Sequence, residues 1–138
     1  MNVLFWCIVI GFSIAQISCI EVPKQYMDED VLACIEELKP DQSKLLSIFD
    51  DNFYITTEDL DMYNLIECSS DKSKLIKDNE LDETLTIIEI NKTLSVLTKE
   101  DSNVAKIIFD QCKNAKGDRV AKRLINFHNC VVDEINKL

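Results

Sequence analysis

The chain has 138 residues and a formal net charge of -10 at pH 7, and 46% of its residues are hydrophobic. A chain of this length forms one domain with a core of modest size. Such an acidic protein repels phosphate backbones and anionic lipid surfaces, which excludes nucleic acid as a partner. The acidity indicates solubility or, as the alternative, steering of a cationic partner.

The N-terminal segment predicts export. Residues 1–19 carry no charged side chain, and Val3 to Ile14 is almost wholly apolar. This run is too short to span a bilayer but has the length of the apolar core of a signal peptide. We therefore predict a signal peptide over 1–19, cleaved after Cys19, and a secreted, extracellular domain over 20–138. No later stretch is long and apolar enough for a membrane helix, so stable membrane insertion is not expected.

The spacing of apolar residues predicts an all-α fold. Beyond the predicted leader the chain keeps one glycine and two prolines, which disfavours a turn-rich β architecture. A first helix is expected over 26–38, where Pro40 stops it. Asp41 then caps a short helix, and a loop follows over 50–55.

The second half of the chain continues the helical pattern. The polar stretch 69–79 is expected to end the third helix and to turn. Basic residues and Gly117 close the fifth helix. The expected first residues of the last four helices are Thr57, Asp82, Thr98 and Asp118. The chain thus predicts about six helices.

Four cysteines remain after the predicted cleavage, each on the inner stripe of a different helix: Cys34, Cys68, Cys112 and Cys130. An even number in an exported chain indicates disulfides, with three pairings open. Zinc is the competing interpretation, but zinc sites use closely spaced pairs, and these cysteines are separated by 33, 43 and 17 residues. We therefore predict disulfides, no metal site and no cofactor.

The cysteine spacing resembles that of the insect odorant-binding protein family (the pheromone/general odorant-binding fold). That family usually has six cysteines, the third following the second after three residues and the sixth following the fifth after eight. On this pattern the second place falls on Asn64, and the fifth falls on Ala121, midway through Cys112-x8-Ala121-x8-Cys130. In the family these two cysteines bond to each other, so losing both leaves no unpaired thiol. The chain is therefore similar to the minus-C type with four framework cysteines.

The resemblance implies two disulfides, Cys34–Cys68 and Cys112–Cys130, and about six crossed helices around an internal apolar cavity. It implies a secreted carrier that binds a small hydrophobic ligand (an odorant, pheromone or lipid-like compound) for transport or sequestration. A role in olfaction would add a chemosensory receptor as a candidate partner, and we expect a monomer or a weak dimer. Without the Asn64–Ala121 link, the third and sixth helices are expected to separate more easily.

Several apolar side chains on the predicted inner faces are candidate walls of this cavity, with ordinary core packing as the alternative for each. The candidate ligand-binding residues are Leu45, Ile48, Phe49, Phe53, Leu65, Ile88, Val104, Ile108, Leu124, Phe127 and Val131. Tyr54 and Tyr63 are candidates to offer a hydroxyl, although solvent-facing positions are favoured. His128 titrates in the range of a pH switch. Because Phe127 and Val131 occupy the inner face, however, we expect His128 to point to solvent.

The residues give no catalytic set. One histidine and two glycines leave no Ser-His-Asp triad, no phosphate-cradling loop and no H-E-x-x-H site, so the chain is not expected to be an enzyme. Asn91-Lys92-Thr93 is an N-glycosylation sequon inside a predicted helix, and the sequence leaves its use open. The alternative to a carrier is a secreted helical interaction protein, such as a cytokine-like, venom or salivary factor that acts on a protein partner.

Overall fold

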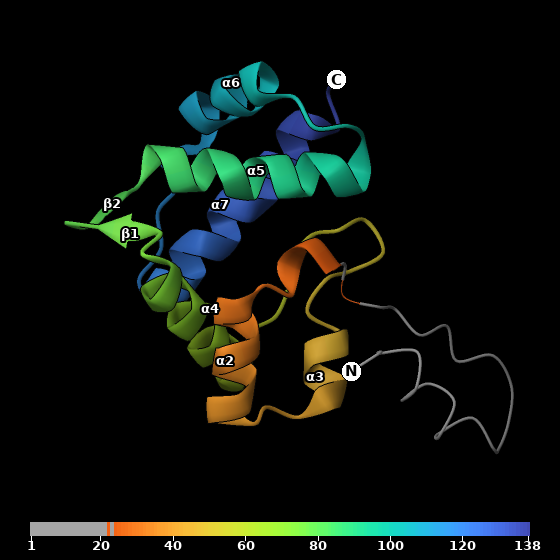
Figure 1. Cartoon of the computed structure of the whole chain (residues 1–138). Coiled ribbons are helices and arrows are strands. Elements are labelled where there is room, and N and C mark those ends of the chain that lie inside the picture. Colours follow the sequence, from red (N-terminus) through yellow and green to blue (C-terminus); the bar gives the residue numbers. More distant parts are fainter. Residues whose placement is uncertain (1–21, 23) are drawn as a thin grey trace, which may run out of the picture.

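A computed structural model describes Val22 and residues 24–138, so the predicted signal peptide over 1–19 lies outside the described residues. Helices dominate the described part, and the all-α prediction is confirmed (Figure 1). The helices are η1 (Lys24–Tyr26), α2 (Glu29–Leu38), α3 (Gln42–Leu46), α4 (Leu60–Ser73), α5 (Glu83–Leu97), α6 (Ser102–Cys112) and α7 (Val120–Ile135). A short antiparallel hairpin joins α4 to α5 through β1 (Ile76–Lys77) and β2 (Glu80–Leu81).

Aspartate side chains begin five of the six α-helices. Each accepts a hydrogen bond from backbone N–H groups of the first turn, which have no partner inside the helix. The capping residues are Asp28, Asp41, Asp59, Asp82 and Asp101. The predicted starts at Asp41 and Asp82 are confirmed. The predicted starts at Thr57 and Thr98 are wrong, because an aspartate two or three residues later supplies the cap.

Within the stretch 69–79 the helix ends and the chain turns, as predicted, but the turn belongs to a hairpin that the sequence pattern does not predict. Helix α4 continues to Ser73 and ends only at Lys74, which adopts a left-handed conformation with φ 58°. A hairpin then turns at Asp78 and Asn79, whose φ angles are 52° and 65°. Two-residue hairpin turns favour positive φ at both positions, and Asp and Asn tolerate it better than other residues with a side chain. The sequence pattern predicts a turn in this stretch but not the hairpin around it, because the turn contains no glycine.

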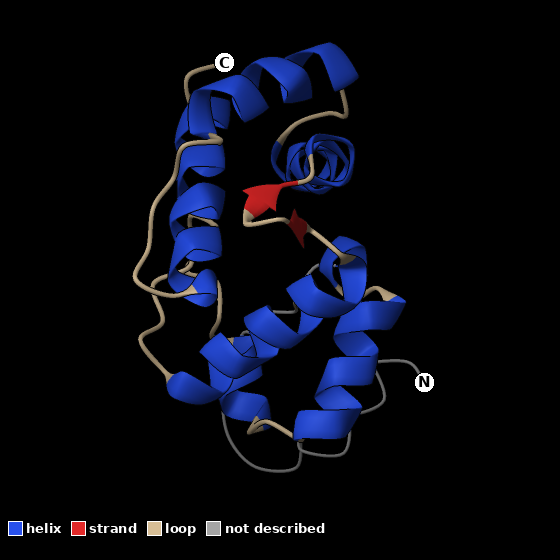
Figure 2. Ribbon diagram, turned by 90° about the vertical axis from the view of Figure 1, so that its left-hand side faces the viewer, coloured by secondary structure: helices blue, strands red, loops and turns tan. Residues whose placement is uncertain are grey.

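The helices form two groups that α7 joins (Figures 1 and 2). Helix α2 packs on α4, while α5 packs on α6, and α7 contacts α4, α5 and α6. Each group has its own buried apolar cluster. One cluster includes Ile90, Phe109 and Val131, and the other includes Phe49, Met62 and Ile125. The half-buried Ile66 packs against both clusters, so the two cores meet at α4.

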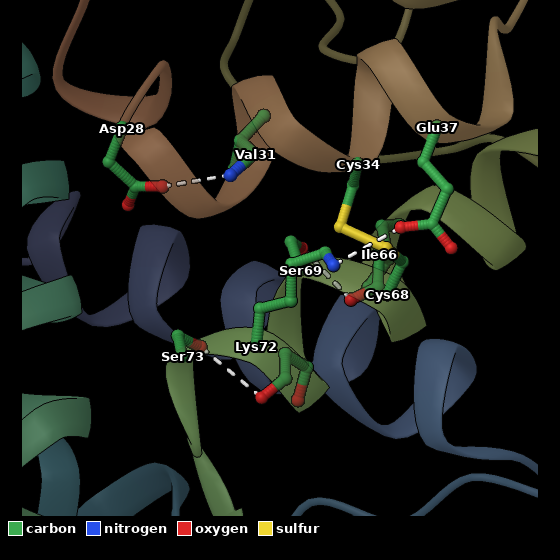
Figure 3. The surroundings of a disulfide bond; sticks show 10 residues. Asp28, Val31, Cys34, Glu37, Ile66, Cys68, Ser69, Lys72 and Ser73 are labelled. Carbon is green, nitrogen blue, oxygen red and sulfur yellow. Dashed lines mark hydrogen bonds and ion pairs between the residues drawn. A yellow bond between two sulfur atoms is a disulfide. The ribbon is translucent and has the colours of Figure 1, made fainter.

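Both predicted disulfides are present. Cys34–Cys68 links α2 to α4 (Figure 3), with 6.0 Å between the Cα atoms. Cys112–Cys130 links α6 to α7, with 5.8 Å between the Cα atoms. The bridges close loops of 34 and 18 residues, and each contributes roughly 3 to 4 kcal/mol by the chain-entropy argument. One bridge therefore lies within the group of α2 and α4, and the other ties the group of α5 and α6 to α7.

An ion pair joins α4 to α7 beside Asn64 and Ala121, the two positions where the six-cysteine family pattern places a third disulfide. Arg119 donates to both carboxylate oxygens of Glu67, at 2.7 and 2.6 Å, and the Ala121 backbone N–H donates to Glu67 Oε1 at 3.0 Å. Helix α7 begins without a side-chain cap of its own, so the predicted cap Asp118 is wrong. Glu67 supplies that cap from α4, placing a negative charge at the positive end of α7.

Replacing Glu67 tests this combination of ion pair and helix cap, which we call the Glu67 anchor. Because Glu67→Ala removes the partner of Arg119 and of the Ala121 N–H, we expect the free energy of unfolding to fall by about 1 to 2 kcal/mol. Glu67→Gln keeps an oxygen for the Ala121 N–H and should lose less. Glu37→Ala is the control, because it removes only the exposed pair with Lys72 between α2 and α4. Urea denaturation measures all three variants, and equal losses for Glu67→Ala and Glu37→Ala would contradict the anchor.

Candidate functional site

A cavity of about 150 Å³ lies where the two helix groups meet. Side chains from η1, α2, α4, α5 and α7 line it. Its apolar wall comes from Val31, Ile66, Leu75, Ile90, Leu124, Phe127 and Val131. Its polar wall comes from Tyr26, Asp28, Ser69, Ser70, Ser73, Glu89, Thr93 and His128. The cavity lining therefore combines apolar side chains with side chains rich in oxygen atoms.

The structure separates the predicted wall residues into three groups. Three of them, on the inner face of α7, line the cavity: Leu124, Phe127 and Val131. Seven belong to the packed clusters instead: Leu45, Ile48, Phe49, Phe53, Leu65, Val104 and Ile108. Placing Ile88 on the inner face is wrong, because its side chain is 49% exposed. Helix α5 instead turns Ile90 and Thr93 toward the cavity. At about 100° per residue, Ile90 lies roughly on the opposite face of the helix from Ile88.

Three charged side chains lie together at the polar wall. Lys92 donates to Asp28 at 2.9 Å and to Glu89 at 2.6 Å. Burial raises the pKa of the Glu89 carboxyl, and the hydrogen bond from Lys92 only partly offsets this. Burial also acts on Asp28, but the hydrogen bonds from Lys92 and the Val31 N–H outweigh it and lower the pKa of that carboxyl. Since one cation faces two carboxylates, negative charge is in excess here.

Hydroxyl groups extend the polar wall. The Tyr26 hydroxyl is hydrogen-bonded to the Thr93 hydroxyl, which donates in turn to the Glu89 carbonyl at 3.3 Å. Burial raises the pKa of the Tyr26 phenol, so it stays protonated. On α4, the Ser69 and Ser73 hydroxyls donate to the carbonyls of Ile66 and Ser70 (Figure 3). Tyr54 and Tyr63 take no part, since their hydroxyls donate to Asp133 and Glu58 outside the cavity.

His128 lines the cavity, so the prediction that it points to solvent is wrong. Its ring lies among Tyr26, Phe49 and Phe53, with centroid distances of 6.1, 5.5 and 6.0 Å. Its Nε2 atom is 2.9 Å from the Phe53 carbonyl oxygen. Because a carbonyl oxygen only accepts hydrogen bonds, Nε2 carries the proton. Burial lowers the pKa of the imidazole, which is therefore neutral at pH 7.

Helix α7 also holds the loop that carries Phe53. The Asn129 side chain accepts from the Ile55 N–H at 2.8 Å and donates to the Ile55 carbonyl at 2.9 Å, as a neighbouring strand would. The Phe53 backbone is in the left-handed region with φ 73°, which is unfavourable for a bulky residue. Its ring stacks on Phe49 at 4.6 Å between centroids. This loop and its aromatic rings therefore support the wall formed by Tyr26 and His128.

Among residues 24–138 no cluster of three or more His, Cys, Asp or Glu side chains is arranged to hold a metal ion. No helix of the described part is long and apolar enough to cross a membrane. Comparisons with protein-family models, curated protein sequences and solved structures found no match to this chain.

The pH dependence of stability tests the placement of His128. In the unfolded chain the His128 imidazole takes up a proton near pH 6.5, whereas burial lowers the pKa of this imidazole in the folded protein. Below about pH 6.5 the unfolded state then binds more protons, so stability falls as pH falls, by at most about 1.4 kcal/mol per pH unit. The effect should be absent in His128→Gln. Urea denaturation at pH 7, 6 and 5 gives the free energy of unfolding of both proteins. If it changes with pH by the same amount in both, His128 lies in solvent.

The structure also decides the expected use of the Asn91 sequon. Asn91 is half-buried inside α5, its Oδ1 atom is buried without a partner among the described residues, and Thr93 is only 2% exposed. A glycan needs an exposed, solvent-facing asparagine. We expect protein secreted from eukaryotic cells to have the same mass before and after treatment with an amidase that removes N-glycans. A mass decrease of one glycan would show that the sequon is used before α5 forms.

Proposed function

We propose that this protein is a carrier that binds a small, largely apolar molecule in the cavity between its two helix groups. The observation that carries the proposal is the position of the cavity at the junction of two packed clusters. A carrier needs a stable wall around an unfilled space. The two disulfides and the Glu67 anchor support such a wall. The family resemblance in the cysteine spacing points to the same function.

The volume of the cavity limits the size of the ligand. An engineered apolar cavity of about 150 Å³ holds benzene, and the cavity here is of that size. A single aromatic ring buries about 200 Å². At about 25 cal/mol per Å² this is worth about 5 kcal/mol, equivalent to a dissociation constant of roughly 0.2 mM. Longer ligands would need the wall to move.

Filling the cavity tests the proposal. We expect the purified protein, with both disulfides formed, to bind toluene at one site in isothermal titration calorimetry. Val31→Phe places extra atoms in the lining and should weaken toluene binding at least about tenfold, because the added side chain occupies the space of the ring. Ile107→Phe is the matched control, because Ile107 lies on α6 with 62% exposure and lines no part of the cavity.

Two outcomes would contradict the proposal. If Val31→Phe binds toluene as well as the unmodified protein, the cavity is not the binding site. If the unmodified protein binds no single-ring compound, the secreted interaction protein becomes the better hypothesis. Thermal denaturation of both variants shows that a lost signal does not come from unfolding.

A further inference from the structure

The polar groups in the cavity wall have already used their own hydrogen-bond donors. The Ser69 and Ser73 hydroxyls donate to backbone carbonyls at 3.0 and 3.2 Å. The Thr93 hydroxyl donates to the Glu89 carbonyl, so the proton between Thr93 and Tyr26 comes from the Tyr26 phenol. What these four hydroxyls leave for a ligand is lone pairs on oxygen, because a hydroxyl has one donor and two acceptor positions.

The other polar atoms of the wall also offer hydrogen-bond acceptors rather than donors. Asp28 and Glu89 offer carboxylate oxygens, which only accept when ionised. His128 donates through Nε2 to Phe53, which leaves Nδ1 as an acceptor. None of the residues that line the cavity is a lysine or an arginine. Lys92 is not among the lining residues, and its ammonium group donates to Asp28 and Glu89.

Ser70 is the exception. Ser70 is only 6% exposed and lines the cavity. Its hydroxyl donates no hydrogen bond to the described residues. A ligand that reaches the polar wall would therefore find one free hydroxyl among a larger number of acceptors.

We propose that the ligand of this cavity is an apolar molecule with a hydrogen-bond donor at one end, best a protonated primary amine, and that carboxylates are rejected. The inference rests on the proposed carrier function and specifies its ligand class. An ammonium group supplies three donors and meets the excess negative charge of Asp28 and Glu89. A carboxylate supplies only acceptors and would face two like charges with no free cation. The apolar residues of the lining contact the ring or chain.

Three single-ring probes with different head groups test this inference: benzylamine, toluene and benzoate. Calorimetry at pH 7 should show benzylamine binding at least about tenfold tighter than toluene, the gain expected for a hydrogen bond to a charged group. Benzoate should show no binding at concentrations where toluene saturates. Benzyl alcohol, a neutral donor, should fall between toluene and benzylamine.

A charge-matched pair of variants locates the contact. Glu89→Gln removes a carboxylate from the wall and should reduce the ratio of benzylamine affinity to toluene affinity about tenfold. Lys92 keeps Asp28 as its partner in this variant. Glu100→Gln makes the same charge change at an exposed residue that lines no part of the cavity, and should change neither affinity.

The outcomes separate the two proposals. If toluene binds and benzylamine binds no tighter, or if benzoate binds as well as toluene, the head-group inference is wrong and the carrier function stands. If benzylamine is favoured but Glu89→Gln keeps its full advantage, the amine does not lie at this wall, and the inference is equally wrong. If none of the probes binds, the carrier function itself fails.

Discussion

The fold depends on how α7 is attached to both helix groups. The Cys112–Cys130 disulfide links α7 to α6, and Glu67 links the first turn of α7 to α4. Along its inner face α7 presents Leu124, Phe127 and Val131 to the space between the groups. Because both groups pack on α7 but keep separate clusters, they meet without filling all of the space between them. The cavity is a consequence of this arrangement.

The Glu67 anchor has a different physical character from the disulfides. A disulfide acts mainly on the unfolded chain, by reducing its conformational freedom. The ion pair between Glu67 and Arg119 acts only in the folded state, where it also satisfies the Ala121 N–H at the start of α7. The side chains are partly exposed, so water weakens the pair relative to a buried one. Helices α4 and α7 are therefore joined at this point by a contact that can break and re-form.

The sequence predicted the elements better than the site, for physical reasons. Aspartate caps and the cysteine positions mark the helices locally, so Asp41 and Asp82 were enough to place two helix starts. On α5, however, Leu85, Ile87, Ile88 and Ile90 point in several directions around the helix, and the inner face could not be chosen from apolarity alone. The buried Thr86 and Thr93 mark that face, but threonine is usually taken as a surface residue. His128 was misplaced because Phe53, which covers it, comes from a loop distant in sequence.

The composition of the cavity wall also bears on why the space stays open. A space lined only by apolar side chains tends to close, because collapse restores contacts between them. Here one wall carries Asp28 and Glu89, whose carboxylates cannot move into the apolar clusters without losing Lys92 or water. The Tyr26–Thr93 hydrogen bond fixes η1 on α5 and keeps the tyrosine ring at the same wall. Two of the polar groups that would contact the head group of the proposed ligand, Tyr26 and Thr93, thus also tie η1 to α5.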